Sequence, residues 1–221
     1  MQFLYHPDAG SPTLRVEGEA YRYLFKVRRR KVGETVALRH LRDDVLYSYR
    51  IEHVSRREAD LTLLSSEERA VTPPSPLHLG WCVIEPKTIE KTLPMLNELG
   101  VGKISFVYCD RSQNHFKLDF ERFERILINS SQQCGHSRMM ELERFESLEA
   151  YLRAYPQSAI LDFGGEPLPC ERRFGSILIG CEGGFSERER RLFAGRALYG
   201  LPTPLILRSE TAAVTAAARG V

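Results

Sequence analysis

The sequence predicts an α/β protein: a mostly parallel sheet with helices on both faces, preceded by a small β-barrel. Three prolines within four residues of Ala70–Pro76 indicate a linker, because proline fits neither a helix interior nor a central strand. Before this linker, short apolar runs are separated by turns. After it, short strands alternate with helical patterns. We therefore expect a β-barrel domain over 1–70, a linker over 71–76 and a second domain over 77–221.

The N-terminal domain is expected to be mostly β-structure. Gly33 marks one turn and the Asp43-Asp44 pair marks another. One short helix is expected over Glu19–Arg29. The expected strands are Thr35–Leu41, Val45–Val54 and Ala59–Leu64. About seventy residues of such short strands are typical of a small barrel.

The second domain alternates strands with helices, the pattern of a parallel sheet built from βαβ units. The expected strands are Leu77–Val83, Ile104–Tyr108, Ser158–Phe163, Ser176–Gly180 and Leu205–Leu207. The expected helices are Ile89–Leu99, Phe120–Gln133, Ser147–Ala154, Ser186–Leu198 and an alanine-rich helix near the C-terminus. Gly100 is placed to end the first of these helices.

The composition is ordinary for a globular protein: 221 residues, 43% of them hydrophobic, with a net charge of +2. The N-terminus shows no signal-peptide pattern, and no apolar run is long enough to span a bilayer, so a cytoplasmic protein without membrane association is expected. The cysteines are single and form no metal-ligand spacing with the histidines. We expect reduced thiols and no metal at Cys82, Cys109, Cys134, Cys170 and Cys181.

The excess positive charge is confined to the first third of the chain. Residues 1–72 hold 13 Lys and Arg against 11 Asp and Glu, whereas the remainder is balanced. The dense part of this excess is the run from Lys26 to Lys31. Such a cluster attracts a phosphate backbone through counterion release, although a solvated turn explains it equally well.

A glycine-rich loop over Gly180–Phe185 joins a predicted strand to a predicted helix. Ser186 and Glu189 form a capping-box pattern at the start of that helix. The loop lacks the lysine of a phosphate-binding Walker loop and does not match the dinucleotide pattern G-x-G-x-x-G. Because it carries Glu182 instead, it favours a ligand with a neutral base, a ribose and a cationic group over a phosphate.

A second loop carries Arg208, which leaves a predicted strand just before the final helix. Parallel strands end at one edge of a sheet, so both loops are expected at the same ligand-binding edge. Arg208 could hold an RNA phosphate or a carboxylate through two hydrogen bonds. The alternative is a salt bridge to Glu210 or Glu182. The alanine-rich final helix indicates that another segment packs close to it.

These segments resemble motifs of the SPOUT superfamily of S-adenosylmethionine-dependent RNA methyltransferases. Ile179–Glu189 is similar to the segment I-G-P-E-G-G-F-S-x-x-E of the bacterial family that methylates N3 of a uridine in small-subunit (16S) ribosomal RNA, with Cys181 in place of proline. Ile206–Ala212 is similar to its segment I-L-R-T-E-T-A. Glu98–Val101 and Arg111-Ser112 match further elements. The resemblance covers the whole chain.

The resemblance implies a sheet tied in a trefoil knot, a PUA-like N-terminal barrel, a homodimer, and ribosomal RNA, within the small subunit, as the substrate. It implies S-adenosylmethionine as cofactor, bound by Leu161, Asp162, Phe163, Gly180, Glu182, Gly183, Gly184, Leu201, Pro202, Leu207, Ser209, Thr211 and Ala212. The candidate catalytic residue is Arg208. The candidate RNA-binding residues are Lys26, Arg28, Arg29, Arg30, Lys31 and Arg111.

The sequence departs from the family pattern on the expected RNA side. His136 stands where the family has arginine, Met95 replaces a lysine, and Gly200–Pro204 replaces the usual L-G-P-R approach. A lone histidine is more often structural than catalytic, and no general base is assigned. Two alternatives stay open: a related enzyme that methylates another nucleotide or transfer RNA, and a non-catalytic RNA-binding or ribosome-assembly factor.

Overall fold

A computed structural model describes residues 3–73, 75–113, 116–169 and 174–219. The chain divides into two compact units. Unit 1 comprises residues 1–72 and 128–139, and unit 2 comprises residues 73–127 and 140–221. The sequence-based boundaries assigned 128–139 to the second domain. Cys170 lies outside the described residues.

Unit 1 is built on a curled sheet whose described strands follow the order β1-β3-β4-β5-β2. The strands are β1 (Leu4–Tyr5), β2 (Thr13–Glu17), β3 (Thr35–Arg39), β4 (Val45–Val54) and β5 (Glu58–Glu68). The β4–β5 pair shifts register after Ser48 and again after Ile51. Such irregularities bend the strands and increase their twist. The inner face carries one apolar core that includes Val16, Leu38 and Leu61.

The helix expected over Glu19–Arg29 ends at Val27, and its winding changes from α-helical to π-helical. Helix α1 covers Gly18–Tyr21, and a π-helical segment follows over Arg22–Val27. In that segment Arg28 N donates to the carbonyl of Tyr23, five residues back, at 2.9 Å. Arg29 then adopts a positive φ of 54°, which ends the helix before the last basic residues.

The end of helix α3 (Phe120–Cys134) and the residues that follow it belong to unit 1. Ser137 N donates to the carbonyl of Val71, and Val71 N donates to Ser137 Oγ, both at 3.0 Å. Asp44 accepts hydrogen bonds from Ser137 Oγ at 2.6 Å and from Arg138 Nε at 2.8 Å. These bonds link the strand turns of unit 1 to a segment that is remote in sequence.

Unit 2 contains a sheet in which every pair of described strands is parallel, as predicted. The strand order is β11-β9-β10-β6-β7-β8. The strands are β6 (Leu77–Cys82), β7 (Val101–Val107), β8 (Glu141–Phe145), β9 (Ala159–Pro167), β10 (Ser176–Ile179) and β11 (Leu198–Gly200). The trefoil knot stays a prediction.

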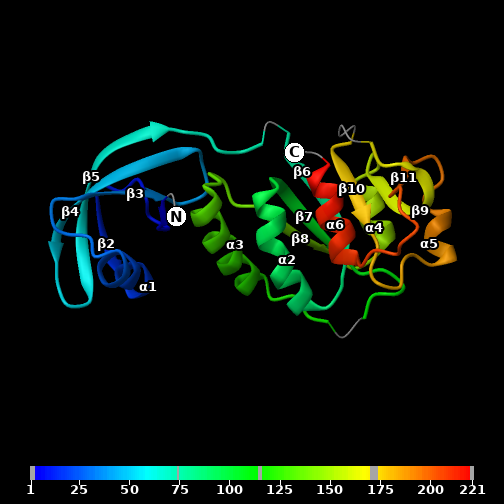
Figure 1. Ribbon diagram of the computed structural model, residues 1–221, viewed down its shortest axis with the longest axis horizontal. Coiled ribbons are helices and arrows are strands. Elements are labelled where there is room, and N and C mark those ends of the chain that lie inside the picture. The colour runs from blue at the N-terminus through cyan, green and yellow to red at the C-terminus, as the bar shows by residue number, and fades with distance from the viewer. Residues whose placement is uncertain (1–2, 74, 114–115, 170–173, 220–221) are drawn as a thin grey trace. The chain divides into compact units, whose positions relative to one another are not determined.

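Helices pack against both faces of this sheet, which confirms the predicted layering (Figure 1). Besides α3, the helices are α2 (Pro86–Glu98), α4 (Leu148–Ala154), α5 (Glu187–Arg191) and α6 (Ser209–Ala218). Residues of β6 alternate between the faces. Trp81 stacks on Phe106 and bonds to Ser209 of α6, whereas His78 meets the rings of Tyr151 and Tyr155 beside α4. None of the helices in the described ranges combines the length and apolar character of a membrane span.

Two predicted elements near the C-terminus are wrong. Leu205–Leu207 is not a strand: Leu205 is 70% exposed and Ile206 81% exposed, so this apolar run lies outside the sheet. The helix expected over Ser186–Leu198 ends at Arg191. Residues Leu198–Gly200, beyond its end, form the edge strand instead. Strand β8 had no expected counterpart.

One glycine in β6 allows a tyrosine to pack directly against the sheet. A Cβ atom on Gly80 would collide with the hydroxyl and ring of Tyr151. That ring is fully buried, and its hydroxyl is within hydrogen-bond distance of Ser158 Oγ, at 2.8 Å, and of Ser176 Oγ, at 2.9 Å. Burial raises the pKa of Tyr151 to about 12, so this hydroxyl stays protonated at neutral pH.

Candidate functional site

A cavity of about 240 Å³ lies in unit 2, where β9 extends past the end of β10. Leu161 pairs with Ile179, the last residue of β10, and the next residues of β9 continue without that neighbour. The cavity is lined by Leu161, Asp162, Phe163, Gly164, Gly165, Ile179, Gly180, Cys181, Gly184, Phe185, Gly200, Leu201, Thr203, Leu205, Leu207, Ser209 and Ala212. It therefore lies at a strand-end edge of the sheet, the predicted location.

The glycine loop forms a tight turn between β10 and α5. Gly184 has a positive φ of 65°, and its N–H donates to the carbonyl of Cys181 at 2.9 Å. Phe185 packs against Gly180, where a Cβ atom would lie 3.3 Å from its ring. The predicted capping box is confirmed: Ser186 Oγ accepts from Glu189 N at 3.1 Å, and Ser186 N donates to Glu189 Oε2 at 2.8 Å.

Ser209, the first residue of α6, connects the two loops. Its hydroxyl donates to the carbonyl of Gly180 at 2.6 Å and accepts from the Trp81 indole N–H at 2.9 Å. Ser209 is only 4% exposed, so these bonds are shielded from water. The start of α6 and the glycine loop are thus held together from beneath the cavity.

A carboxylate in the cavity wall is neutralised by an arginine. Asp162 accepts from Arg190 Nε at 2.7 Å and from Arg190 Nη2 at 3.2 Å. The Asp162 side chain is 7% exposed, whereas that of Arg190 is 43% exposed. The pair joins β9 to α5 and compensates the buried charge of Asp162.

The structure brings together most of the predicted cofactor residues. Those that line the cavity are Leu161, Asp162, Phe163, Gly180, Gly184, Leu201, Leu207, Ser209 and Ala212. Four predicted residues, all exposed, do not line it: Glu182, Gly183, Pro202 and Thr211. The loop expected to present Glu182 to a ligand presents its backbone glycines instead. Cofactor contact stays a prediction for the whole set.

Sequence reasoning missed Gly165 and Gly200, which also line the cavity. A Cβ atom on Gly165 would lie 2.5 Å from the carbonyl carbon of Tyr199, and one on Gly200 would lie 3.0 Å from the Gly165 carbonyl oxygen. Both glycines let β9 and β11 approach closely. The Gly-Gly pair at 164–165 is the available signal in the sequence.

Arg208 is the residue before α6, and its side chain is 84% exposed. The alternative interpretation placed it in a salt bridge, and Glu210 Oε1 does lie 3.9 Å from Arg208 Nη1. At that distance and exposure the pair contributes little to stability. The guanidinium is therefore available to a ligand, and its catalytic role stays a prediction.

Arg111 supports the glycine loop from outside the cavity. Its Nη1 donates to the carbonyl of Gly183 at 2.5 Å, and its side chain covers the position where Gly183 would carry a Cβ atom. The predicted RNA contact of Arg111 therefore competes with a structural bond to the loop.

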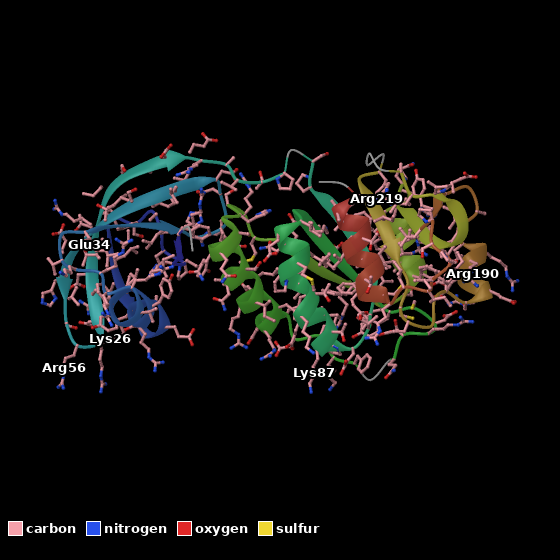
Figure 2. The ribbon with its side chains drawn as sticks, viewed as in Figure 1. Lys26, Glu34, Arg56, Lys87, Arg190 and Arg219 are labelled. Atoms are coloured by element: carbon pink, nitrogen blue, oxygen red, sulfur yellow. The ribbon has the colours of Figure 1, made fainter. Side chains whose placement is uncertain are left out.

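The basic cluster of unit 1 is exposed along its length: Lys26, Arg28, Arg29, Arg30 and Lys31. Arg28 donates to Tyr23 OH at 2.6 Å, and Arg30 pairs with Glu34 at 3.2 Å. Sequence reasoning missed its extension. Lys26 lies over the ring of Tyr21, and the Tyr21 hydroxyl donates to the carbonyl of Ser55 at 2.7 Å. This bond places the exposed β4–β5 turn, which carries Arg56, beside the basic cluster. Figure 2 shows Lys26 and Arg56 pointing away from the strands.

His136 is placed structurally within unit 1. Its Nδ1 lies 2.7 Å from the carbonyl oxygen of Arg138, and burial lowers the pKa of the imidazole. His136 does not line the cavity, so the structure gives no support for its use as a base there.

A second cavity in unit 2, of about 250 Å³, has polar walls. It is lined by Tyr108, Cys109, Asp110, Glu146, Ser147, Leu148, Glu149, Arg188 and Glu189. Arg188 bonds to Asp110 and lowers the pKa of that carboxyl group. Burial raises the pKa of Glu189, whose carboxylate accepts from Asp110 N at 2.8 Å. Among the described residues, no group of three or more His, Cys, Asp or Glu side chains could hold a metal ion.

Comparison with known proteins identifies both parts of the chain. The family model for an RNA methyltransferase domain matches residues 72–220, and that for an RNA methyltransferase PUA domain matches residues 16–64. Ribosomal RNA small subunit methyltransferase E of Helicobacter pylori is 45% identical over 218 residues, which covers 97% of this chain and 96% of that protein.

Solved structures agree with this assignment. A Legionella pneumophila structure described as a methyltransferase with bound S-adenosylmethionine has a TM-score of 0.82 and 27% identity, and the match covers 98% of this chain and 95% of that one. Ribosomal RNA small subunit methyltransferase E of Neisseria gonorrhoeae, also solved with S-adenosylmethionine, shares the fold with a TM-score of 0.82, 22% identity and coverage of 99% and 95%. The chain therefore belongs to the RNA methyltransferase family that includes the ribosomal RNA small subunit methyltransferase E proteins.

Proposed function

We propose that this protein transfers the methyl group of S-adenosylmethionine to N3 of a uridine in 16S ribosomal RNA. The observation that carries the proposal is the cavity of unit 2, whose walls come from the two motif segments at Ile179–Glu189 and Ile206–Ala212. The 45% identity to a ribosomal RNA small subunit methyltransferase supports the substrate class.

The cavity wall suits the proposed cofactor. Leu161 and Leu207 offer apolar contacts for an adenine ring, and the backbone at Gly180 and Gly200 can be approached closely. Among the described residues of the lining, none is a lysine or arginine that would favour a phosphate. Bound S-adenosylmethionine would supply an electrophilic methyl group on a sulfonium centre. Asp162 would face this cationic ligand as a carboxylate already held by Arg190.

The protein's own contribution to the reaction is positioning and electrostatic stabilisation. Uridine N3 must lose a proton before it attacks, and negative charge then develops on the base oxygens. Arg208, exposed beside the cavity-lining Leu207 and Ser209, is the candidate donor to that charge. The structure supplies no residue that we assign as the general base.

The exposed basic surface of unit 1 would bind the RNA backbone within the small subunit, in the cytoplasm. We further propose a homodimer. Leu205 and Ile206 are 70% and 81% exposed, and such neighbouring apolar side chains favour burial by a second copy.

Mass spectrometry of ribosomal RNA from a deletion strain tests the proposal. We expect the loss of one 3-methyluridine from 16S RNA, restored by the wild-type gene. Unchanged 16S RNA together with a missing methyl group in transfer RNA would overturn the proposed substrate. Unchanged RNA together with no binding of S-adenosylmethionine by calorimetry would instead indicate a non-catalytic factor.

A further inference from the structure

Two thiols that are remote in sequence meet beneath the glycine loop. Cys109 follows the end of β7 and Cys181 follows the end of β10, and these strands flank β6 on either side. The two Sγ atoms are 3.5 Å apart across 72 residues of sequence. Disulfide formation would bring them to about 2.05 Å, a displacement small enough for side-chain rotation and a slight loop shift.

The thiol pair lies between the two cavities of unit 2. Cys181 lines the candidate cofactor cavity, whereas Cys109 lines the second, polar cavity. The two residues are 6% and 5% exposed, so each cavity provides a route to sulfur for a small solute only. A peroxide is small and polar enough to enter the second cavity beside Asp110 and Glu149.

The two sulfurs differ in reactivity. Hydrogen bonding with the neighbouring thiols of Cys181 and Cys82 lowers the pKa of Cys109. The same contact with Cys109, together with burial, raises the pKa of Cys181. Because the thiolate is the nucleophile, Cys109 would react first and Cys181 would act as the resolving thiol.

We propose that Cys109 and Cys181 form a dithiol that hydrogen peroxide oxidises to a disulfide, weakening cofactor binding in the adjacent cavity; the second half of this statement rests on the proposed function. The Cys109 thiolate attacks one peroxide oxygen, forming an S–O bond, and the O–O bond breaks to release hydroxide. Cys181 sulfur then attacks Cys109 sulfur, and the S–O bond breaks. Protons from the two thiols convert both hydroxides to water, so two thiols and one peroxide give one disulfide and two waters.

The effect on the cavity follows from how tightly the loop is held. The carbonyl of Cys181 accepts the N–H of Gly184, and the preceding carbonyl, of Gly180, accepts the Ser209 hydroxyl. Movement of Cys181 toward Cys109 therefore displaces backbone that lines the cavity.

The test treats the purified full-length protein with hydrogen peroxide and digests it without reduction. We expect mass spectrometry to detect a peptide pair linked through Cys109 and Cys181. By calorimetry, the dissociation constant for S-adenosylmethionine should rise by about tenfold, the loss of roughly one hydrogen bond, and should recover on reduction with dithiothreitol.

Cys109→Ser is the test variant, and Cys134→Ser, at a half-buried thiol of unit 1, is the matched control. Cys109→Ser should keep its affinity after peroxide, whereas Cys134→Ser should lose it as the wild type does. Absence of the linked pair, or a Cys82–Cys109 link in its place, overturns the proposal. A linked pair with unchanged affinity overturns the coupling. If the reduced protein does not bind S-adenosylmethionine, the proposed function fails, while the peptide measurement still decides whether the disulfide forms.

Discussion

The hydroxyl of Ser209 donates a 2.6 Å hydrogen bond to the carbonyl of Gly180, which joins helix α6 to the glycine loop. The same hydroxyl accepts the indole N–H of Trp81 at 2.9 Å, so one buried oxygen connects two cavity walls to the central strand β6. The geometry of the cavity therefore depends on this side chain.

Replacement of Ser209 by alanine should weaken both the fold and ligand binding. The buried Trp81 N–H and Gly180 carbonyl would lose a partner, at a cost of about 1–3 kcal/mol in the free energy of unfolding. Urea denaturation measures this loss, and calorimetry measures the expected fall in affinity for S-adenosylmethionine. Ser209→Thr keeps the hydroxyl and is the control. Equal stability of Ser209→Ala and wild type would contradict this role.

Arg208→Ala should reduce methyl transfer without reducing cofactor affinity. If the guanidinium stabilises charge on the uridine oxygens, its loss should lower turnover by about 10²-fold or more. Single-turnover assays with 16S RNA measure the rate, and calorimetry measures affinity. Glu210→Gln removes the neighbouring carboxylate and should leave turnover near that of the wild type. Unchanged turnover in Arg208→Ala would contradict the catalytic role assigned to Arg208.

Neutralising the basic surface of unit 1 should weaken RNA binding and its dependence on salt. Each lost phosphate contact should reduce the slope of log affinity against log salt by about 0.7–0.9. We expect this for glutamine substitutions at Lys26, Arg28, Arg29, Arg30 and Lys31. A second variant, Arg56→Gln with Arg57→Gln, should show a smaller change of the same kind. Lys87→Gln on α2 is the control, and identical slopes for all three proteins would refute the RNA surface.

The stability of the protein should fall between about pH 6.5 and pH 4 because of His78. Burial, assisted by the positive charge of Lys103, lowers the pKa of His78 from 6.5 to about 4. The unfolded chain therefore binds a proton at a pH where the folded chain does not, so acidification favours unfolding, by up to about 3 kcal/mol. Urea denaturation at pH 7 and pH 4.5 measures this.

His78→Gln keeps a donor for Ser105, which lies 2.6 Å from His78 Nε2, but does not titrate. Its free energy of unfolding should vary less over this pH range than that of the wild type. Equal pH dependence in the two proteins would show that other groups account for the acid sensitivity.

Much of the fold could be predicted because its signals are local. The capping box at Ser186 and the alternation of strands and helices each depend on neighbouring residues. The C-terminal strand was misplaced because Leu205 and Ile206 have the composition of a strand but are exposed. Only tertiary structure shows that β9 pairs instead with Leu198–Gly200.

The candidate site was predictable where it coincides with motif residues, such as Gly180 and Ser209. Contacts across the fold could not be predicted. The Asp162–Arg190 pair and the approach of Gly165 to Gly200 join positions whose proximity depends on strand order. The meeting of Cys109 with Cys181 depends on it in the same way, although both cysteines were visible in the sequence.

The packing of Tyr151 on Gly80 has an evolutionary consequence. A side chain at position 80 and a tyrosine at position 151 exclude each other, because the tyrosine hydroxyl is fixed by Ser158 and Ser176 and cannot turn away. Position 80 therefore cannot gain a side chain while Tyr151 remains. Descendants of this sequence should therefore lose the glycine only after, or together with, the tyrosine, so that the two positions covary as a pair.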